Sequence, residues 1–307
     1  MKYTQGMAVL VMMVLAVGFV AAQDMEMIES HLGNEGPAFH EGMTPESLGW
    51  GADDQAYPDR FVVYRDGSEL VWVPAGSFPM GSTDAEVAEL LMSYSGPEDD
   101  LIGLLYRAEI PQRMVEMDGF WIQKHAVTNV QYRAFCDSTG REFPPGSDQG
   151  DYHPVVWVSW DDAVSYAEHY GLGLPTEAQW EYVARGPAGL RYPWGDEWDP
   201  ERLCWDENRG PGDRSFTVGS FPDGVSWCGA LDIVGNVLQW CADWYDPNYY
   251  QSAQGSNPTG AIEGDARVVR GGTWYLDRPE SFRAAFRNLT DPATRYISLG
   301  FRCALTP

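Results

Sequence analysis

Apolar positions along this chain form short runs, separated by long stretches rich in glycine, proline and aspartate. Apolar side chains at helical spacing, preceded by capping residues, predict helices at 129–138, 160–170 and 176–184. Short runs of strand-forming residues predict strands at 70–74, 120–124, 267–271 and 300–304. The remainder is typical of loops. We therefore expect a mixed, irregular fold that buried aromatic side chains or bound metal ions hold together.

Two further segments show helical apolar spacing, one on each side of Gly96 and Pro97. Because glycine and proline end helices, this pattern predicts a helical hairpin inserted into a surface loop at 83–113. We expect the insertion to pack against the domain. A lid over a binding groove is the alternative, since long inserted loops often have a function.

The N-terminal segment determines the expected compartment. Lys2 precedes an apolar stretch at 7–20, and small residues follow at Ala21 and Ala22. This order is typical of a secretory signal peptide at residues 1–22. An uncleaved membrane anchor is the alternative, but an apolar run of about 14 residues is shorter than the ~20 that span a bilayer. We expect export to the periplasm, the cell surface or the medium.

The chain is acidic, with a formal net charge of −25 and a sequence pI of about 4.3. This charge excludes nucleic acid as a partner, because contacts with phosphates require clustered lysine and arginine. Residues 23–60 are acidic and lack periodicity, which predicts a linker or a loosely packed arm. Residues 61–307 then form the domain. We expect no membrane contact once the signal peptide is removed, since no other stretch is long and apolar enough.

The common catalytic motifs are missing from the sequence. It has no Gly-x-Ser-x-Gly elbow, no phosphate-binding glycine loop that ends in lysine and no His-Glu-x-x-His helix. Acidic pairs such as Glu177 and Glu181 are interpreted as helix-start and surface charges in so acidic a chain. The sequence does not exclude a pair of catalytic carboxylates for glycoside hydrolysis, because such a pair is defined by the distance between the two groups in the folded protein.

Six segments between Glu69 and Ala304 carry a family pattern in a fixed order. They read ELVWVPAGSFPMGS, GFWIQKHAVTNVQYRAF, HPVVWVSWDDAVSYAEHYGLGLPTEAQWEYVARG, YPWGDEWDP, GALDIVGNVLQWCADWY and RVVRGGTWYLDRPESFRAAFRNLTDPATRYISLGFRCA. Together they resemble the formylglycine-generating enzymes, also called sulfatase-modifying factors. The resemblance implies an α+β fold that is irregular, loop-rich and low in secondary structure. It also implies a relation to C-type lectins and bound calcium.

The resemblance implies a copper site as well. Those enzymes bind copper through two cysteine thiolates five residues apart, just after a glycine pair like Gly271-Gly272. Here the two positions are Leu276 and Ser281. Soft Cu(I) needs a close pair of thiolates, and this turn contains no cysteine. We expect neither copper nor formylglycine-generating activity. The alternative is an oxidoreductase of the same family that uses non-standard metal ligands.

The cysteines of the chain are Cys136, Cys204, Cys228, Cys241 and Cys303. In an exported chain they predict at least one disulfide, with one thiol left over. Cys204 and Cys228 flank a loop and are the first candidates for a pair. The resemblance implies a partner for Cys303 in a helix where this chain has Ala167. Cys303 therefore pairs elsewhere, for example with Cys136, or stays buried and reduced.

A calcium site is the best-supported metal site in the sequence. The predicted ligands, which match the second calcium site of the family, are the side chains of Asp232 and Gln239 and the carbonyls of Gly235 and Val237. The alternative is a glycine turn that leads into a buried strand, with Asp232 as its cap. The segment WDENRGPGDRSF offers oxygens for a first calcium site, but in a register that the sequence leaves open.

The tail also supplies the residues expected along a ligand-binding groove. They are Thr273, Trp274, Tyr275, Arg278, Arg283, Arg287 and Asn288. Aromatic rings and guanidiniums suit a peptide, protein or glycan ligand. The alternative for Arg283 and Arg287 is an internal role, in which they tie loops to buried carboxylates. We expect a calcium-stabilised binding or assembly module; a variable ligand-display protein is a specialised form of it.

Overall fold

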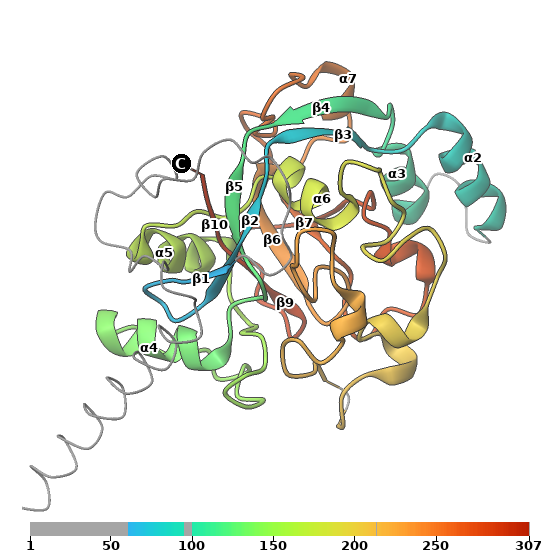
Figure 1. Cartoon of the computed structure of the whole chain (residues 1–307). Helices are drawn as coiled ribbons and strands as arrows, with labels where there is room; N and C mark the ends of the chain where they lie inside the picture. The colour runs from blue at the N-terminus through green and yellow to red at the C-terminus, as the bar shows by residue number, and fades with distance from the viewer. Residues whose placement is uncertain (1–60, 95–99, 213, 307) are drawn as a thin grey trace, which may run out of the picture. The chain divides into compact units, whose positions relative to one another are not determined.

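The computed structural model describes residues 61–94, 100–212 and 214–306 (Figure 1). The expected signal peptide at 1–22 and the acidic arm at 23–60 lie outside the described residues. Among the helices that the structure does describe, none has both the length and the apolar character needed to cross a membrane.

One antiparallel sheet joins the beginning and the end of the domain. Its strand order is β1-β2-β5-β10. The strands are β1 (Phe61–Val63), β2 (Glu69–Val73), β5 (Phe120–Gln123) and β10 (Ala304–Leu305). Because β10 pairs with β5, the last strand of the chain closes the sheet that the first strands began.

A second four-stranded sheet is built from the C-terminal half, in the order β8-β7-β6-β9. Its strands are β6 (Leu238–Trp244), β7 (Arg267–Arg270), β8 (Asn288–Thr290) and β9 (Leu299–Gly300). β9 runs parallel to β6, and the other pairs are antiparallel. A separate ribbon pairs β3 (Gly76–Met80) with β4 (Arg113–Met117).

The single strand predicted at 300–304 is wrong in one respect, because two short strands replace it. β9 ends at Gly300 in one sheet, and β10 begins at Ala304 in the other. Between them the Arg302 guanidinium is fully buried and donates to the carbonyl oxygens of Gln123 and Leu231. The segment therefore crosses from one sheet to the other.

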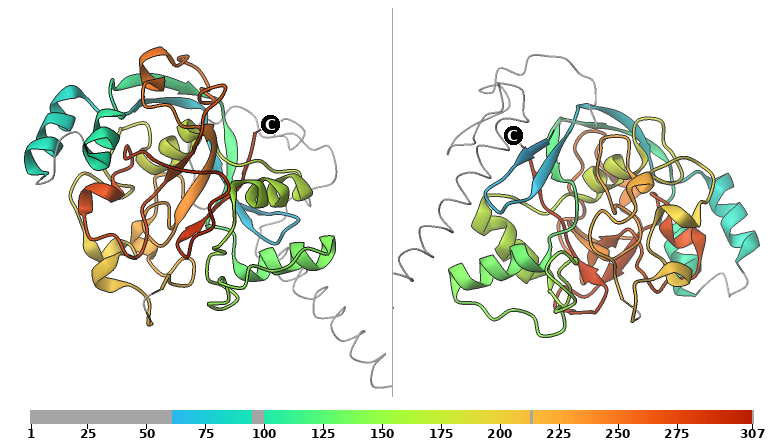
Figure 2. Two further views of the ribbon diagram at one scale, coloured as in Figure 1. Left: turned by 180° about the vertical axis from the view of Figure 1, so that it is seen from behind. Right: turned by 60° about the horizontal axis from the view of Figure 1, so that its bottom comes forward.

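The three helices predicted from capping residues are confirmed. They are α4 (Asn129–Thr139), α5 (Trp160–Tyr170) and α6 (Glu177–Arg185). The Ser159 and Thr176 hydroxyls accept hydrogen bonds from the third residue of α5 and α6, which satisfies donors that a helix start leaves open. Gly140 and Gly171 end α4 and α5 in the left-handed conformation. α4 and α5 lie side by side (Figure 2).

The helical insertion contains α2 (Asp84–Ser93) and α3 (Leu101–Arg107), as the apolar spacing predicts. Val87, Leu90 and Leu105 are buried in a small cluster with Phe286 of the tail. The insertion therefore packs against the segment in which the groove was expected.

The rest of the described chain is mainly loop. The remaining regular elements are one short helix, α7 (Tyr249–Ser252), and the 3-10 turns η2 (Pro200–Arg202), η3 (Asp206–Asn208), η4 (Pro222–Gly224) and η5 (Pro279–Phe282). The fold is α+β, irregular and low in secondary structure, as the resemblance implies.

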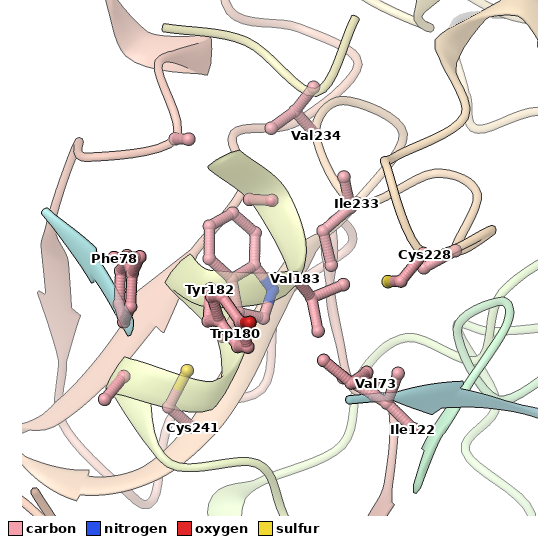
Figure 3. Close-up of a cluster of buried hydrophobic side chains, with 14 of the residues drawn as sticks. Val73, Phe78, Ile122, Trp180, Tyr182, Val183, Cys228, Ile233, Val234 and Cys241 are labelled. Carbon is pink, nitrogen blue, oxygen red and sulfur yellow. The ribbon is translucent and has the colours of Figure 1, made fainter. Parts of the chain in front are cut away.

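α6 lies at the centre of the core. All nine of its residues are buried. Figure 3 shows Trp180, Tyr182 and Val183 of this helix surrounded by side chains from both sheets and from the loop before β6. Val73 and Ile122 approach from the first sheet. A helix buried on every face is unusual, and its charged residues must find partners inside the protein.

Candidate functional site

The tail makes a tight turn directly after β7. Gly271 and Gly272 have φ values of +98° and +72°, in the left-handed region that favours glycine. A Cβ on Gly272 would lie 2.6 Å from the Phe282 ring, and one on Gly271 would lie 2.8 Å from the Ile233 carbonyl oxygen. Gly235 N donates to the Gly271 carbonyl at 2.7 Å. Glycine is required at both positions, and the turn fixes the path of the residues that follow.

The two positions that would hold copper ligands carry no thiol. Leu276 packs against the main core cluster, and its carbonyl accepts a hydrogen bond from Asp206 N at 3.2 Å. Ser281 is only 6% exposed, and its amide donates to the Arg278 carbonyl at 3.0 Å. The turn thus presents an alkyl side chain and a neutral hydroxyl, neither of which suits a soft metal.

The expected disulfide is not formed. All of the chain's cysteines are free and buried. Cys204 is 1% exposed, and burial raises its pKa to about 12. Cys228 is fully buried next to the Ser226 hydroxyl, 3.4 Å away. Cys303 matches the alternative that it stays buried and reduced. Each thiol fills a place in the core, where burial raises its pKa and disfavours the reactive thiolate.

The predicted groove residues lie at different depths. Thr273 and Trp274 are buried, whereas Tyr275 and Asn288 are half-buried and Arg278 is exposed. Of these five residues, only Tyr275, Asn288 and Arg278 offer accessible surface to a ligand.

Arg283 and Arg287 do not line an open groove. Arg283 donates through both terminal nitrogens to Glu109, at 2.8 and 2.6 Å. Arg287 holds Glu177 in the same two-pronged manner, at 2.7 and 2.9 Å. Burial by itself lowers the pKa of Arg283, but the charge of Glu109 outweighs it and raises that pKa. The geometry matches the alternative that these arginines tie loops to buried carboxylates.

The acidic pair on α6 was interpreted as surface charge, and that interpretation is wrong. Glu177 and Glu181 are 1% and 0% exposed. Glu181 accepts hydrogen bonds from Arg185, Arg270 and the amide of Gly81. Although burial raises the pKa of Glu181, the charges of the two arginines outweigh it and lower that pKa. The sequence gives one usable signal, because five of the nine residues of this helix are apolar or aromatic, including Trp180 and Tyr182 on either side of Glu181.

Three of the predicted calcium ligands, Asp232, Gly235 and Val237, lie in a buried turn before β6, and Gln239 lies within β6. Asp232, with φ +50°, accepts one hydrogen bond on Oδ2, from Gly219 N at 2.6 Å. Burial raises the pKa of its carboxyl, so a nearby cation would stabilise the charged form. Gln239 is already engaged, since its Oε1 accepts from Trp180 Nε1 at 3.1 Å and Arg302 Nε at 2.7 Å. The residues fit calcium only through the Asp232 carboxylate, and calcium stays a prediction.

Two buried hydrogen-bond donors without partners belong to the turn after β7 and to the segment that contacts it. The indole N–H groups of Trp205 and Trp274 donate to no acceptor among the described residues, although both residues are more than nine-tenths buried. The two segments are in contact, because Asp206 N donates to Leu276 O and Trp274 N donates to Asn236 O. An unpaired buried donor costs about 1–3 kcal/mol, which an acceptor on a ligand or a bound water would offset.

Comparisons with known proteins agree with this geometry. The Sulfatase-modifying factor enzyme 1-like domain model matches residues 59–307. The chain is 33% identical to the formylglycine-generating enzyme of Thermomonospora curvata over 307 aligned residues, covering 78% of this chain and 93% of that protein. It is 31% identical to serine/threonine-protein kinase Pkn1 of Chlamydia trachomatis, covering 77% of this chain. That match spans only 38% of the chlamydial protein.

Solved structures show the same fold. PvdO from Pseudomonas aeruginosa superimposes with a TM-score of 0.65 at 26% identity, covering 82% of this chain and 99% of that one. Treponema denticola variable protein 1 has a TM-score of 0.62 at 20% identity, covering 80% and 99% of the two chains, which shows the fold alone. The match over 59–307 confirms the resemblance seen in the sequence. This chain belongs to the sulfatase-modifying factor family.

Proposed function

We propose that this protein is an exported binding or assembly module of the sulfatase-modifying factor family, without formylglycine-generating activity. The observation that carries the proposal is the turn after β7. Its backbone is held by Gly271 and Gly272. Where copper thiolates would be needed, a partly buried Leu276 packs against the core and Ser281 supplies a buried hydroxyl.

The cysteines elsewhere in the chain also support the absence of a copper site. Metal-binding thiols act as thiolates, and burial raises the pKa of every cysteine in the chain. Cys241 is fully buried within β6, and Cys303 is fully buried between β9 and β10. Neither lies in the turn of 273–281, so neither replaces a missing ligand there.

A peptide or glycan ligand suits the surface around the turn. Arg278 is exposed, and its guanidinium lies 5.2 Å from the centre of the Tyr94 ring of the helical insertion. Tyr275 is half-buried, and the exposed part of its ring can stack on a ring of the ligand.

Export and calcium belong to the same proposal. The order of charged, apolar and small residues at 1–22 supports export. The singly bonded Asp232 carboxylate supports a calcium ion that strengthens the loop before β6.

Binding to peptide and glycan libraries tests the proposal. We expect a saturable ligand whose affinity falls about tenfold in Arg278→Gln, because charge-assisted hydrogen bonds contribute about that much. Arg202→Gln is the matched control, since Arg202 is a similarly exposed arginine that pairs with Asp199 at 2.7 Å. An equal loss in both variants would show that the tail does not bind the ligand. Turnover of a cysteine-containing peptide would favour the alternative, an oxidoreductase with non-standard ligands.

A further inference from the structure

A pocket of about 540 Å³ lies between α4, the start of α5 and the loops that follow α4 and β8. Tyr132, Phe143 and Trp157 supply its aromatic walls, and Arg141 and Arg295 supply its positive charge. None of the residues of the turn at 271–281 lines it. The volume is within the range of small-ligand sites, which is about 300–1,000 Å³.

The Trp157 wall of this pocket is held in a fixed position. Trp157 has φ +60°, an uncommon value for a residue with a side chain, and its amide donates to the Tyr296 carbonyl at 3.0 Å. A Cβ on Gly146 would lie 2.2 Å from Trp157 Nε1, so the loop backbone packs directly against the indole edge. Strain of this kind persists where the surroundings fix it, often at binding sites.

Two arginines and two carboxylates, Asp162 and Glu142, line the pocket. Asp162 lies between the arginines and is half-buried. Asp162 Oδ2 accepts from Ser159 N at 3.0 Å and from Arg295 Nε at 3.0 Å. Arg141 Nη1 lies 3.9 Å from Asp162 Oδ1, at the limit of an ion pair, and its Nη2 donates to the Ser165 hydroxyl at 3.1 Å. Both arginine side chains are about half exposed, at 46% and 52%. Because both guanidiniums contact Asp162 and are still about half exposed, they can also bind one carboxylate of a ligand.

Polar groups with unused hydrogen-bonding capacity also line the pocket. Tyr132 is 3% exposed, yet none of the hydrogen bonds formed among residues 61–94, 100–212 and 214–306 uses its hydroxyl. The Trp157 indole N–H, which also lines the pocket, likewise forms no hydrogen bond with another described residue. Glu142 adds an exposed carboxylate, which accepts hydrogen bonds and disfavours a ligand with several negative charges.

We propose that this pocket binds a sugar ring that bears a single carboxylate, a uronate residue. The carboxylate would lie between Arg141 and Arg295, and the apolar face of the ring would stack on Trp157. Ring hydroxyls would accept from the Tyr132 hydroxyl and donate to Glu142. This combination of aromatic wall, arginine pair and mixed donors and acceptors fits a hydroxylated acid better than a phosphate or a bare aromatic acid. The inference is independent of the function proposed for the tail.

Calorimetric titration of the full chain with galacturonate tests the proposal. Two matched ligands accompany it: the methyl ester of galacturonate, which lacks the charge, and benzoate, which lacks the hydroxyls. We expect saturable binding of galacturonate that weakens at least about tenfold for the ester and for benzoate. Arg141→Gln and Tyr132→Phe should each weaken binding, whereas Arg202→Gln should not.

Several results would overturn the proposal. Equal binding of the ester would show that no carboxylate is recognised, and equal binding of benzoate would show that no sugar is recognised. Unchanged affinity in Arg141→Gln, with the native near-ultraviolet circular dichroism retained, would place the ligand elsewhere. Absence of saturable binding at millimolar galacturonate would also contradict it. Arg295→Gln is a second variant on the other side of the carboxylate, should Arg141→Gln fail to fold.

Discussion

Arg287 and Glu177 form a two-pronged ion pair in the interior, with Nε–Oε1 and Nη2–Oε2 distances of 2.7 and 2.9 Å. The partners are 110 residues apart in the sequence and 0% and 1% exposed. Arg270 lies 3.6 Å from the same carboxylate and also contacts Glu181. Two glutamates of α6 therefore hold the tail in place on both sides of the glycine turn.

Loss of one partner from this network should be costly. Arg287→Leu leaves Glu177 buried without its main counter-charge, and we expect the free energy of unfolding to fall by about 3–5 kcal/mol. Urea denaturation measures the change. Arg202→Leu removes an arginine from an exposed pair and should leave the stability nearly unchanged. Equal stability of the two variants would mean that the buried pair does not support the fold.

The sequence predicted local elements well and long-range partners poorly. α5 and α6 start with hydrogen bonds between residues three positions apart, at Ser159 and Thr176. Because these contacts are local, the sequence pattern was sufficient to predict both helices. The partners of Arg283 and Arg287 lie more than one hundred residues away, and a sequence shows charges without showing which ones meet. Both roles of these arginines were therefore left open.

Three other differences between the sequence predictions and the structure also arise from long-range contacts. The strand predicted at 300–304 was divided because Arg302 leaves the sheet to bind carbonyls elsewhere, which an apolar pattern cannot show. The disulfide between Cys204 and Cys228 was wrong because cysteine count and compartment give no distances. The pocket at Trp157 was not predicted, since its walls come from four separate segments.

Stability should depend on pH through Asp243. This carboxyl is 2% exposed and accepts a hydrogen bond from Glu177 N at 2.8 Å. Burial, reinforced by the charge of Glu177, raises its pKa to about 8. In the unfolded chain an aspartate titrates near pH 3.9, so between about pH 4 and 8 the folded state holds a proton that the unfolded state has lost. The stabilisation from this group is therefore complete below pH 4 and declines as pH rises to 8.

Denaturation at a series of pH values measures this effect. Asp243→Asn should remove a slope of up to about 1.4 kcal/mol per pH unit across that window. Asp199→Asn, at an exposed position, serves as the control. An unchanged slope in Asp243→Asn would show that the group is ionised in the folded protein.

Thiol counting checks the redox state of the cysteines. Without reductant, we expect an aromatic disulfide reagent to label all five thiols in denaturant and essentially none in the native protein. The reason is burial, which excludes the reagent and raises each thiol pKa. A count of three thiols in denaturant would reveal one disulfide and contradict the structure.

Calcium should stabilise the loop before β6. After chelation, calcium added at one hundred times its Kd should raise the free energy of unfolding by about 2.7 kcal/mol. Asp232→Asn should abolish the increase, because it removes the negative charge of the carboxylate that accepts from Gly219 N. Magnesium at the same concentration tests ion specificity. A full calcium effect in Asp232→Asn would place the ion at another site.

The proposed loss of formylglycine-generating activity depends on the absence of thiolates in the glycine turn. Its decisive test is oxygen uptake with a Cys-x-Pro-x-Arg peptide, combined with copper and iron analysis of the purified protein. We expect neither stoichiometric copper or iron nor turnover for the natural sequence. The variant Leu276→Cys/Ser281→Cys should gain Cu(I) binding, because Gly271 and Gly272 keep the turn in shape. Peptide oxidation by the natural sequence with a stoichiometric redox metal would show that the family's oxidase activity persists without these thiolates.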